Sequence, residues 1–162
     1  MVEFRQVGFD DDEGLKYLTK VSMDIKDTEE ALGYIGYPDD EIFLTNSSKF
    51  IIAATIDPTT YYTIVATIDD EIVGGLVGEI TYPGGVSMDN EVGMIKLIGV
   101  EPEYRDQDIG KTLVAMFEDW CWDRGITLME AALYAGNEIP QEGLAALGWG
   151  IEFVLMTKRI KR

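Results

Sequence analysis

Histidine is absent from this sequence of 162 residues, and cysteine occurs once, at Cys121. The lack of histidine excludes Ser-His-Asp triads, Cys-His dyads and nearly all zinc or non-haem iron sites. Proton transfer must therefore use carboxylates, tyrosine, lysine, cysteine, the backbone or water. A single cysteine forms no internal disulfide, which fits an intracellular protein. We expect a cytoplasmic protein without a metal site.

Long hydrophobic runs are also missing. No apolar stretch approaches the ~18 residues that a membrane-spanning helix needs, so we expect no membrane contact. The first residues, MVEFRQVGFDDDEG, lack the basic and apolar regions of a signal peptide. With 46% apolar and 27% charged residues, the composition is that of one globular domain spanning residues 1–162.

Positive charge is scarce, and the formal net charge is −17. Residues 1–91 contain 19 acids and 5 bases, whereas residues 92–162 contain 11 acids and 8 bases. Such an acidic first half repels nucleic acid phosphates, so we expect no nucleic acid partner. It would attract a cationic small molecule or a basic peptide, or it is solvated surface that favours solubility.

Hydrophobic periodicity and turn residues predict an alternating order of strands and helices. Ser47 or Ser48 as N-cap favours a helix over a strand for residues 47–56. Residues 27–30, DTEE, resemble a capping box that opens a short helix around residues 31–35. The expected strands are 2–7, 62–68, 72–82, 92–100, 126–135 and 152–160, and the expected helices begin near 10, 31, 47, 111 and 140. This order predicts an α/β fold, a mixed twisted sheet with helices on both faces.

One segment carries a recognisable anion-binding pattern. Residues 100–113 read VEPEYRDQDIGKTL, a loop between a predicted strand and a predicted amphipathic helix. Consecutive backbone N–H groups and the positive end of the helix dipole can bind a pyrophosphate there. The segment resembles the V-x-P-x-x-R-G-x-G-I-G cofactor motif of the GNAT superfamily of N-acetyltransferases.

Three further segments support the resemblance in the correct order. Residues 70–75, DEIVGG, are similar to the family's D-G-x-I-V-G hairpin, and the strand ending in Lys158 matches the usual close of the domain. The family pattern N-x-x-A-x-x-x-Y-x-x-x-G-F aligns with Asn137, Pro140, Leu144 and Gly148-Trp149. The four motifs together cover about 100 residues and predict an acyl-CoA N-acyltransferase-like fold.

The resemblance implies direct acyl transfer from acetyl-CoA, as cosubstrate, to an amine. Residues 1–60 would supply acceptor-side helices, and residues 61–162 the cofactor-side core. In the family, the pantetheine arm inserts between two splayed strands, here those ending near Val100 and Asn137. The cofactor-binding residues it implies are Ile98, Gly99, Val100, Arg105, Asp106, Gln107, Asp108, Ile109, Gly110, Lys111 and Asn137.

The phosphate loop departs from the family at Asp106 and Asp108, which stand where glycine is common. Two readings of Asp108 remain open. Its carboxylate could cap the following helix and occupy the amides that would bind phosphate. Alternatively, the substitution is tolerated and the cofactor still binds, with Arg105 and Lys111 offsetting part of the repulsion.

The catalytic acid and base are less clear. Leu144 occupies the position of the tyrosine that protonates the departing thiolate in many relatives. Met94 and Lys96 hold the positions where the family often places a carboxylate base, so nearby groups are candidates. We expect the catalytic residues among Glu91, Glu79 and Tyr134, with Glu130 as a further candidate. The alternative is a catalytically degenerate, phage-type GNAT-like protein that acts as a structural or binding subunit, in an oligomer or larger assembly.

Overall fold

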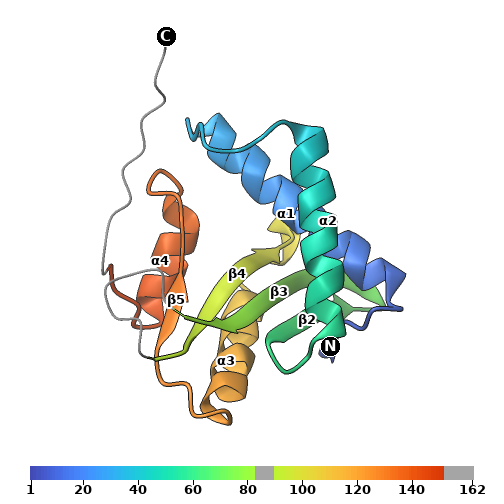
Figure 1. Cartoon of the computed structure of the whole chain (residues 1–162), viewed down its shortest axis with the longest axis vertical. Coiled ribbons are helices and arrows are strands. Elements are labelled where there is room, and N and C mark those ends of the chain that lie inside the picture. The colour runs from blue at the N-terminus through green and yellow to red at the C-terminus, as the bar shows by residue number, and fades with distance from the viewer. Residues whose placement is uncertain (83–89, 152–162) are drawn as a thin grey trace.

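The computed structural model describes residues 1–82 and 90–151, which form a five-stranded sheet in sequential order (Figure 1). Adjacent strands are antiparallel from the first to the fourth, and the fifth is parallel to the fourth. The strands are β1 (Val2–Gln6), β2 (Tyr61–Ile68), β3 (Glu71–Thr81), β4 (Val92–Val100) and β5 (Met129–Ala131). The predicted mixed sheet is confirmed.

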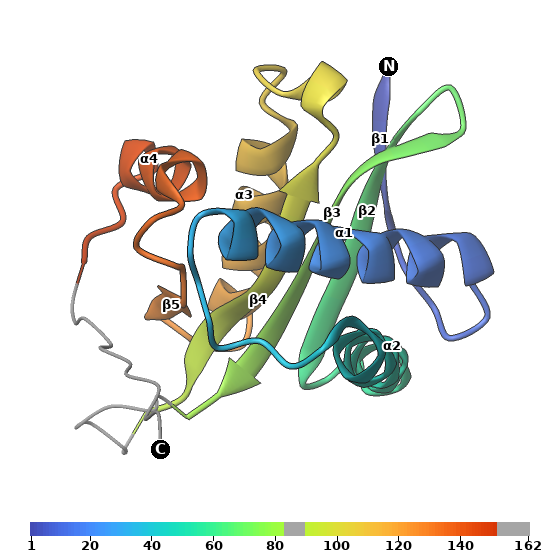
Figure 2. The same cartoon turned by 90° about the horizontal axis from the view of Figure 1, so that it is seen from above.

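Helices cover both faces of this sheet. α1 (Asp12–Ala31) crosses one face with α2 (Asp40–Ile56) beside it, and α3 (Ile109–Trp122) lies behind the other face (Figure 2). α4 (Glu138–Ala146) lies next to β5, and a short 3-10 helix, η1 (Pro102–Tyr104), precedes α3. In the described ranges, no helix is both long and apolar enough to cross a membrane.

Glycines in the central strands let the helices approach the sheet closely. A Cβ atom at Gly75 would lie 2.8 Å from Leu18 of α1, and one at Gly99 would lie 2.5 Å from Val21. On the opposite face, a Cβ at Gly78 would collide with the Phe117 ring of α3. Each helix therefore packs its apolar stripe directly onto strand backbone, which gives two buried clusters, one on each side of the sheet.

The first two helices differ from their predicted limits. α1 runs without a break through the capping-box residue Asp27, so the short helix predicted at residues 31–35 is wrong. α2 begins at Asp40, capped by the Asp39 carboxylate, rather than at Ser47. Lys26 explains the arrangement: its buried ammonium binds Asp40 at 2.6 Å and Glu30 at 2.7 Å, which ties the start of α2 to the end of α1.

Two other predicted strands also differ in outcome. The strand predicted at residues 126–135 is shorter in the structure and comprises Met129–Ala131. The chain then turns away from the sheet towards α4. The predicted strand 152–160, with Lys158, lies outside the described residues. The predicted β2–β3 hairpin is confirmed, and its turn residues Asp69 and Asp70 adopt the positive φ angles that a tight primed turn requires.

Substitution of Gly78 by alanine tests the close packing. Because the new methyl group would overlap the Phe117 ring, we expect a loss of about 1–3 kcal/mol in the free energy of unfolding. Gly143→Ala is the matched control, because that α4 position is open and alanine is the better helix former. Urea denaturation of both variants measures the difference. Equal stability of the two variants would contradict the packing described.

Candidate functional site

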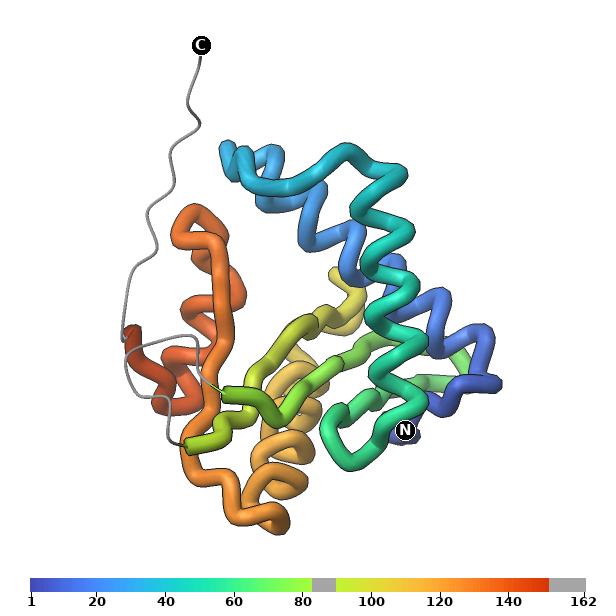
Figure 3. Tube along the Cα trace, viewed as in Figure 1, coloured from blue at the N-terminus to red at the C-terminus, as the bar shows by residue number. Residues whose placement is uncertain are grey.

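An irregularity in β4 defines the site. Neighbouring residues Val77 and Gly78 of β3 pair with Leu97 and Ile95 of β4, so Lys96 is an extra, bulged residue. The β4–β5 ladder ends at the same place, with the pair Ile95–Ala131. Beyond this pair, β4 and the segment that follows β5 diverge (Figure 3). In the described ranges, the last residues of β4 have a strand partner on one side only.

The open edge of β4 presents specific backbone groups. Glu101 donates its N–H to Val73 of β3, so odd-numbered residues in this part of β4 face β3. The N–H and C=O groups of Ile98 and Val100 therefore point to the unpaired edge. Arg105 confirms this direction, because its Nε donates to the Val100 carbonyl from outside the sheet at 3.2 Å. An extended ligand could add to this edge as a strand does.

Two non-glycine residues in the loop after β4 adopt the positive φ angles that glycine usually adopts. Asp106 has φ 64° and Asp108 has φ 57°, both in the left-handed region. These are the two positions at which the family motif commonly has glycine. The sequence resemblance thus extends to the conformation of the loop, and aspartate is among the few residues that tolerate it.

The first amides of α3 point out of the helix without partners. Thr112 N–H donates to Asp108 C=O at 2.9 Å, whereas in the described ranges the N–H groups of Ile109, Gly110 and Lys111 form no hydrogen bond. The Asp108 side chain does not cap the helix, so the interpretation of Asp108 as an internal surrogate anion is wrong. The left-handed backbone explains this, because a capping residue normally has extended φ and ψ angles.

Charge around these amides is mixed. Arg105 and Lys111 are exposed cations on the two sides of the loop, and Asp106 and Asp108 are exposed anions within it. Because all four side chains are exposed, solvent and salt screen both attraction and repulsion. The amides and the helix dipole remain available to an anion. The free amides favour an anion at this loop, and the two carboxylates oppose it.

The loop between β5 and α4 is fixed by Gln141, which the sequence reading did not single out. Its Nε2 donates to the carbonyls of Tyr134, Ala135 and Asn137 at 2.9–3.0 Å. Asn137 is the N-cap of α4, but its side chain makes no capping hydrogen bond. The amide side chain of Asn137 is thus left available, as the cofactor-binding prediction requires. No pattern in a single sequence identifies a fork of this kind.

The predicted catalytic residues lie in three different places. Glu79 of β3 lies beside the bulge, with Oε2 at 3.4 Å from Lys96 Nζ and a side chain 17% exposed. Burial, together with the neighbouring Glu79 carboxylate, raises the pKa of Tyr61, which is therefore a neutral phenol. Glu91 precedes β4, five strand residues or about 16 Å from Lys96. The structure does not bring Glu91 to the bulge.

Tyr134 lies on the far side of the open edge, in the loop before α4. Its hydroxyl donates to the Leu32 carbonyl at 3.4 Å, and its ring contacts that of Tyr34 at 5.2 Å. Tyr34 in turn contacts Tyr37, whose hydroxyl donates to Glu29. These rings join the β5–α4 loop to the α1–α2 loop. Glu130 lies on β5 and pairs with Met94 of β4. Leu144 is buried in the core, and its hydrocarbon side chain cannot donate a proton to a thiolate.

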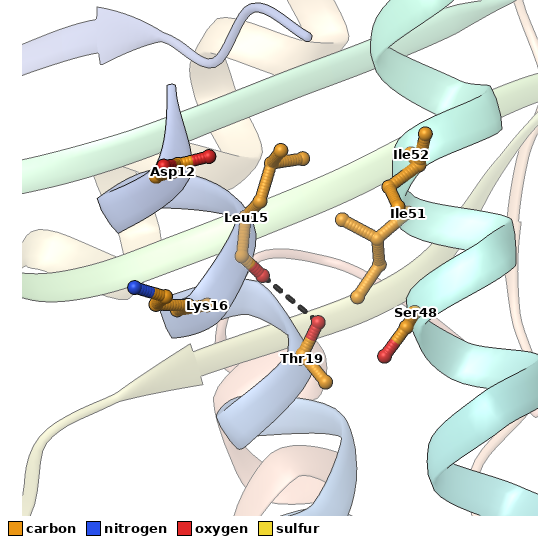
Figure 4. A pocket seen from close by; sticks show the side chains of 7 residues that line it. All are labelled: Asp12, Leu15, Lys16, Thr19, Ser48, Ile51 and Ile52. Carbon is orange, nitrogen blue, oxygen red and sulfur yellow. Dashed lines mark hydrogen bonds between the residues drawn. The ribbon is translucent and has the colours of Figure 1, made fainter. Parts of the chain in front are cut away.

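Two hollows lie away from this edge. One, of about 330 Å³, lies between the first half of α1 and the second half of α2 and is largely apolar, lined by Leu15, Ile51 and Ile52 among others (Figure 4). The other, of about 470 Å³, contains Glu91 and Arg124 at the opposite end of β4 from the anion-binding loop. Neither includes the free amides of α3.

A bulged fourth strand, a splayed fifth strand and an anion-binding loop define the class of CoA-type acyltransferase folds. A family model described as the acetyltransferase (GNAT) family matches residues 24–148. The chain belongs to this family, which confirms the resemblance.

Solved structures of this class share the fold over the whole chain. A GCN5-related N-acetyltransferase from Ralstonia eutropha JMP134 is 20% identical with a TM-score of 0.75, covering 99% of both chains. AAC(6')-Iy, bound to a CoA bisubstrate analogue, is 20% identical with a TM-score of 0.70, covering 100% of this chain and 99% of its own. The AAC(6')-IG enzyme of Acinetobacter haemolyticus is 16% identical with a TM-score of 0.72, covering 98% and 99%. No curated protein matches the sequence.

Replacing Asp108 by glycine tests the role of charge in the loop. A carboxylate ~5 Å from a phosphate costs on the order of 3 kcal/mol at an effective dielectric of about 20, before screening. Since Asp108 is exposed, we expect Asp108→Gly to lower the Kd for CoA about tenfold in low salt. Asp119→Asn, which removes a charge from an exposed position farther along α3, is the control. Calorimetry with no gain, or with an equal gain in the control, would contradict this role.

Gln141→Glu tests the fork that holds the β5–α4 loop. The substitution keeps the size of the side chain but replaces its N–H donors by a carboxylate that faces three carbonyls. We expect a stability loss of about 1–3 kcal/mol. Amide exchange of Asn137, whose N–H donates to Tyr134 C=O, should accelerate. Unchanged exchange at Asn137 would show that the fork does not order this loop.

Proposed function

We propose that this protein is an acetyl-CoA-dependent N-acetyltransferase that transfers the acetyl group directly to an amine. The observation that carries the proposal is the presence of two sets of backbone N–H donors that have no partner within the described residues. One set, Ile98 and Val100, lies on the open edge of β4, and the other lies at the start of α3. Family membership and the CoA complex of AAC(6')-Iy support the same cosubstrate.

Different groups of the protein bind the pyrophosphate and the pantetheine arm of acetyl-CoA. The amides of Ile109, Gly110 and Lys111 hold the pyrophosphate, with the Arg105 guanidinium beside them. The edge groups of Ile98 and Val100 bind the pantetheine arm, and the Asn137 amide binds it from the other side. A backbone N–H on this edge also polarises the thioester carbonyl. Acetyl-CoA supplies an activated acyl group, so no covalent enzyme intermediate is needed.

Glu79 is the residue best placed to remove the proton of the acceptor amine. Its carboxylate is largely buried at the bulge, where the β4–β5 ladder ends. It shares a face of the sheet with Phe50 of α2, because Lys96 Nζ lies near both groups. An amine that enters between the α1–α2 side and β4 meets this carboxylate first. Water or Tyr134 then protonates the departing thiolate, because Leu144 cannot.

The acceptor is a cationic amine of a small molecule or a basic peptide. Aromatic rings and carboxylates meet at the loop that follows α1, where Tyr34 and Tyr37 lie next to Tyr134 and Glu29. Rings of this kind bind ammonium groups through their faces, and carboxylates bind them by charge. The relatives meta-AAC0020, in complex with sisomicin, and AAC(6')-Iy, with an acetylneamine analogue, support a small polyamine of this type.

Calorimetry with acetyl-CoA, followed by a CoA-release assay, tests the proposal. The acceptor panel is neamine, spermidine and a lysine-containing peptide, each with an acetyl-CoA-only control. We expect saturable binding and release of free CoA that depends on at least one of the amines. If millimolar acetyl-CoA gives neither heat nor a shift in melting temperature, the proposal is wrong, and a non-catalytic role of the fold takes its place.

Substitution of Glu79 by glutamine tests its assignment as the base. Because a positioned general base contributes roughly 10²–10⁴-fold, we expect kcat/KM to fall by at least ~100-fold with little change in acetyl-CoA binding. Glu71→Gln, at the exposed start of the same strand, is the control and should retain full activity. Glu91→Gln should also remain active. Loss of activity in Glu91→Gln with an active Glu79→Gln would move the base to Glu91.

A further inference from the structure

The bulge itself places an amine beside the proposed base. Ile95 and Ile98 pack with the α3-side core, whereas Leu97 packs with the α1–α2 side. The extra residue between them, Lys96, reaches the same side as Leu97, with Nζ 3.4 Å from Glu79 and 5.9 Å from the centre of the Phe50 ring. Two consecutive side chains thus face the acceptor side of the sheet.

The Lys96 side chain carries a primary amine and lies beside Glu79, where the acceptor amine of the substrate is proposed to bind. Its side chain is 39% exposed, so it is neither locked in the core nor free in solvent. The open backbone groups of Ile98 begin two strand residues away, about 7 Å along β4. A lysine side chain of roughly that length can turn from Glu79 towards this edge by rotating about its own torsions.

The other lysines within residues 1–82 and 90–151 differ from Lys96. The Lys26 ammonium is buried and bound by two carboxylates, and hydrogen bonds to Asp40 and Glu30 raise its pKa. Lys20 also lies near the end of β4, but its ammonium is bound by two carboxylates, Glu101 at 2.7 Å and Asp24 at 3.1 Å, whereas Lys96 has one. Lys16 and Lys49 are exposed on α1 and α2. Only a lysine that has both a carboxylate and the thioester-binding edge within reach can be acetylated by the machinery proposed above.

We propose that Lys96 is a site of self-acetylation when no acceptor amine is present; the inference rests on the proposed function. The Glu79 carboxylate takes one proton from the Lys96 ammonium and later passes it to water. The freed Nζ lone pair forms a C–N bond to the acetyl carbonyl carbon of acetyl-CoA, and the C–S bond breaks. The thiolate leaves with the second amine proton, which gives CoA-SH and Nε-acetyl-lysine.

Acetylation of Lys96 would change the site that produced it. The amide is neutral, so the ion pair with Glu79 is lost and the carboxylate is free to meet an incoming ammonium. An acceptor amine and the Lys96 ammonium compete for the same carboxylate. Added acceptor therefore slows the modification of Lys96.

Mass spectrometry of the full chain with acetyl-CoA alone tests the inference. Enzymatically deacetylated protein is incubated, and peptides report the acetyl occupancy of Lys96 against Lys16 and Lys49, which measure uncatalysed acetylation. We expect Lys96 to react about a hundredfold faster, at a rate independent of protein concentration. Glu79→Gln should remove this advantage without changing Lys16 or Lys49. Lys96→Arg, which keeps the charge, should remove the dominant product.

The outcomes separate this inference from the function on which it rests. If acetyl-CoA binds and an amine of the panel is acetylated while Lys96 reacts no faster than Lys16, self-acetylation is wrong and the function stands. If Lys96 reacts fast in Glu79→Gln as well, the proposed proton path is wrong. If acetyl-CoA does not bind and no lysine is selectively modified, both proposals fail.

Discussion

The extra residue in β4 is the constraint on which the rest of the site depends. In a regular parallel pair the ladder hydrogen bonds continue evenly along both strands and use the backbone groups on the shared edge. Lys96 is inserted between Ile95 and Leu97 where the parallel pairing stops, and within the described residues the edge groups of Ile98 and Val100 have no strand partner. The bulge brings Lys96 beside Glu79, so one irregularity opens the binding edge and forms the polar cluster next to it.

In the loop between β4 and α3, aspartate residues adopt the left-handed backbone conformation that glycine usually adopts. Asp106 and Asp108 hold left-handed conformations, which cost an aspartate more than a glycine. Within the described residues the first α3 amides have no side-chain cap, so the proposed anion site keeps its donors. Its affinity is set by the balance between these donors and the exposed charges of the loop, and that balance depends on salt.

Much of the fold could be predicted from the sequence, because strand periodicity, the hairpin turn and the α3 motif are local signals. The start of α2 at Asp40 could not, since this helix has no clear polar face and its position is set by the distant Lys26. A cap by Asp108 was one of two readings that residue preference left open, and the left-handed φ angle of the loop decides against it. The bulge at Lys96 and the Gln141 fork arise from pairing across the chain, which a single sequence does not show.

Residue-resolved amide exchange with and without acetyl-CoA tests the central claim most directly, because neighbouring residues of β4 face opposite ways. The N–H groups of Ile98 and Val100 point to the open edge, whereas that of Gly99 points to β3 and serves as an internal reference. The account predicts that saturating acetyl-CoA slows exchange at Ile98 and Val100, and at the first amides of α3, with little change at Gly99. Unchanged exchange at Ile98 and Val100 would contradict it.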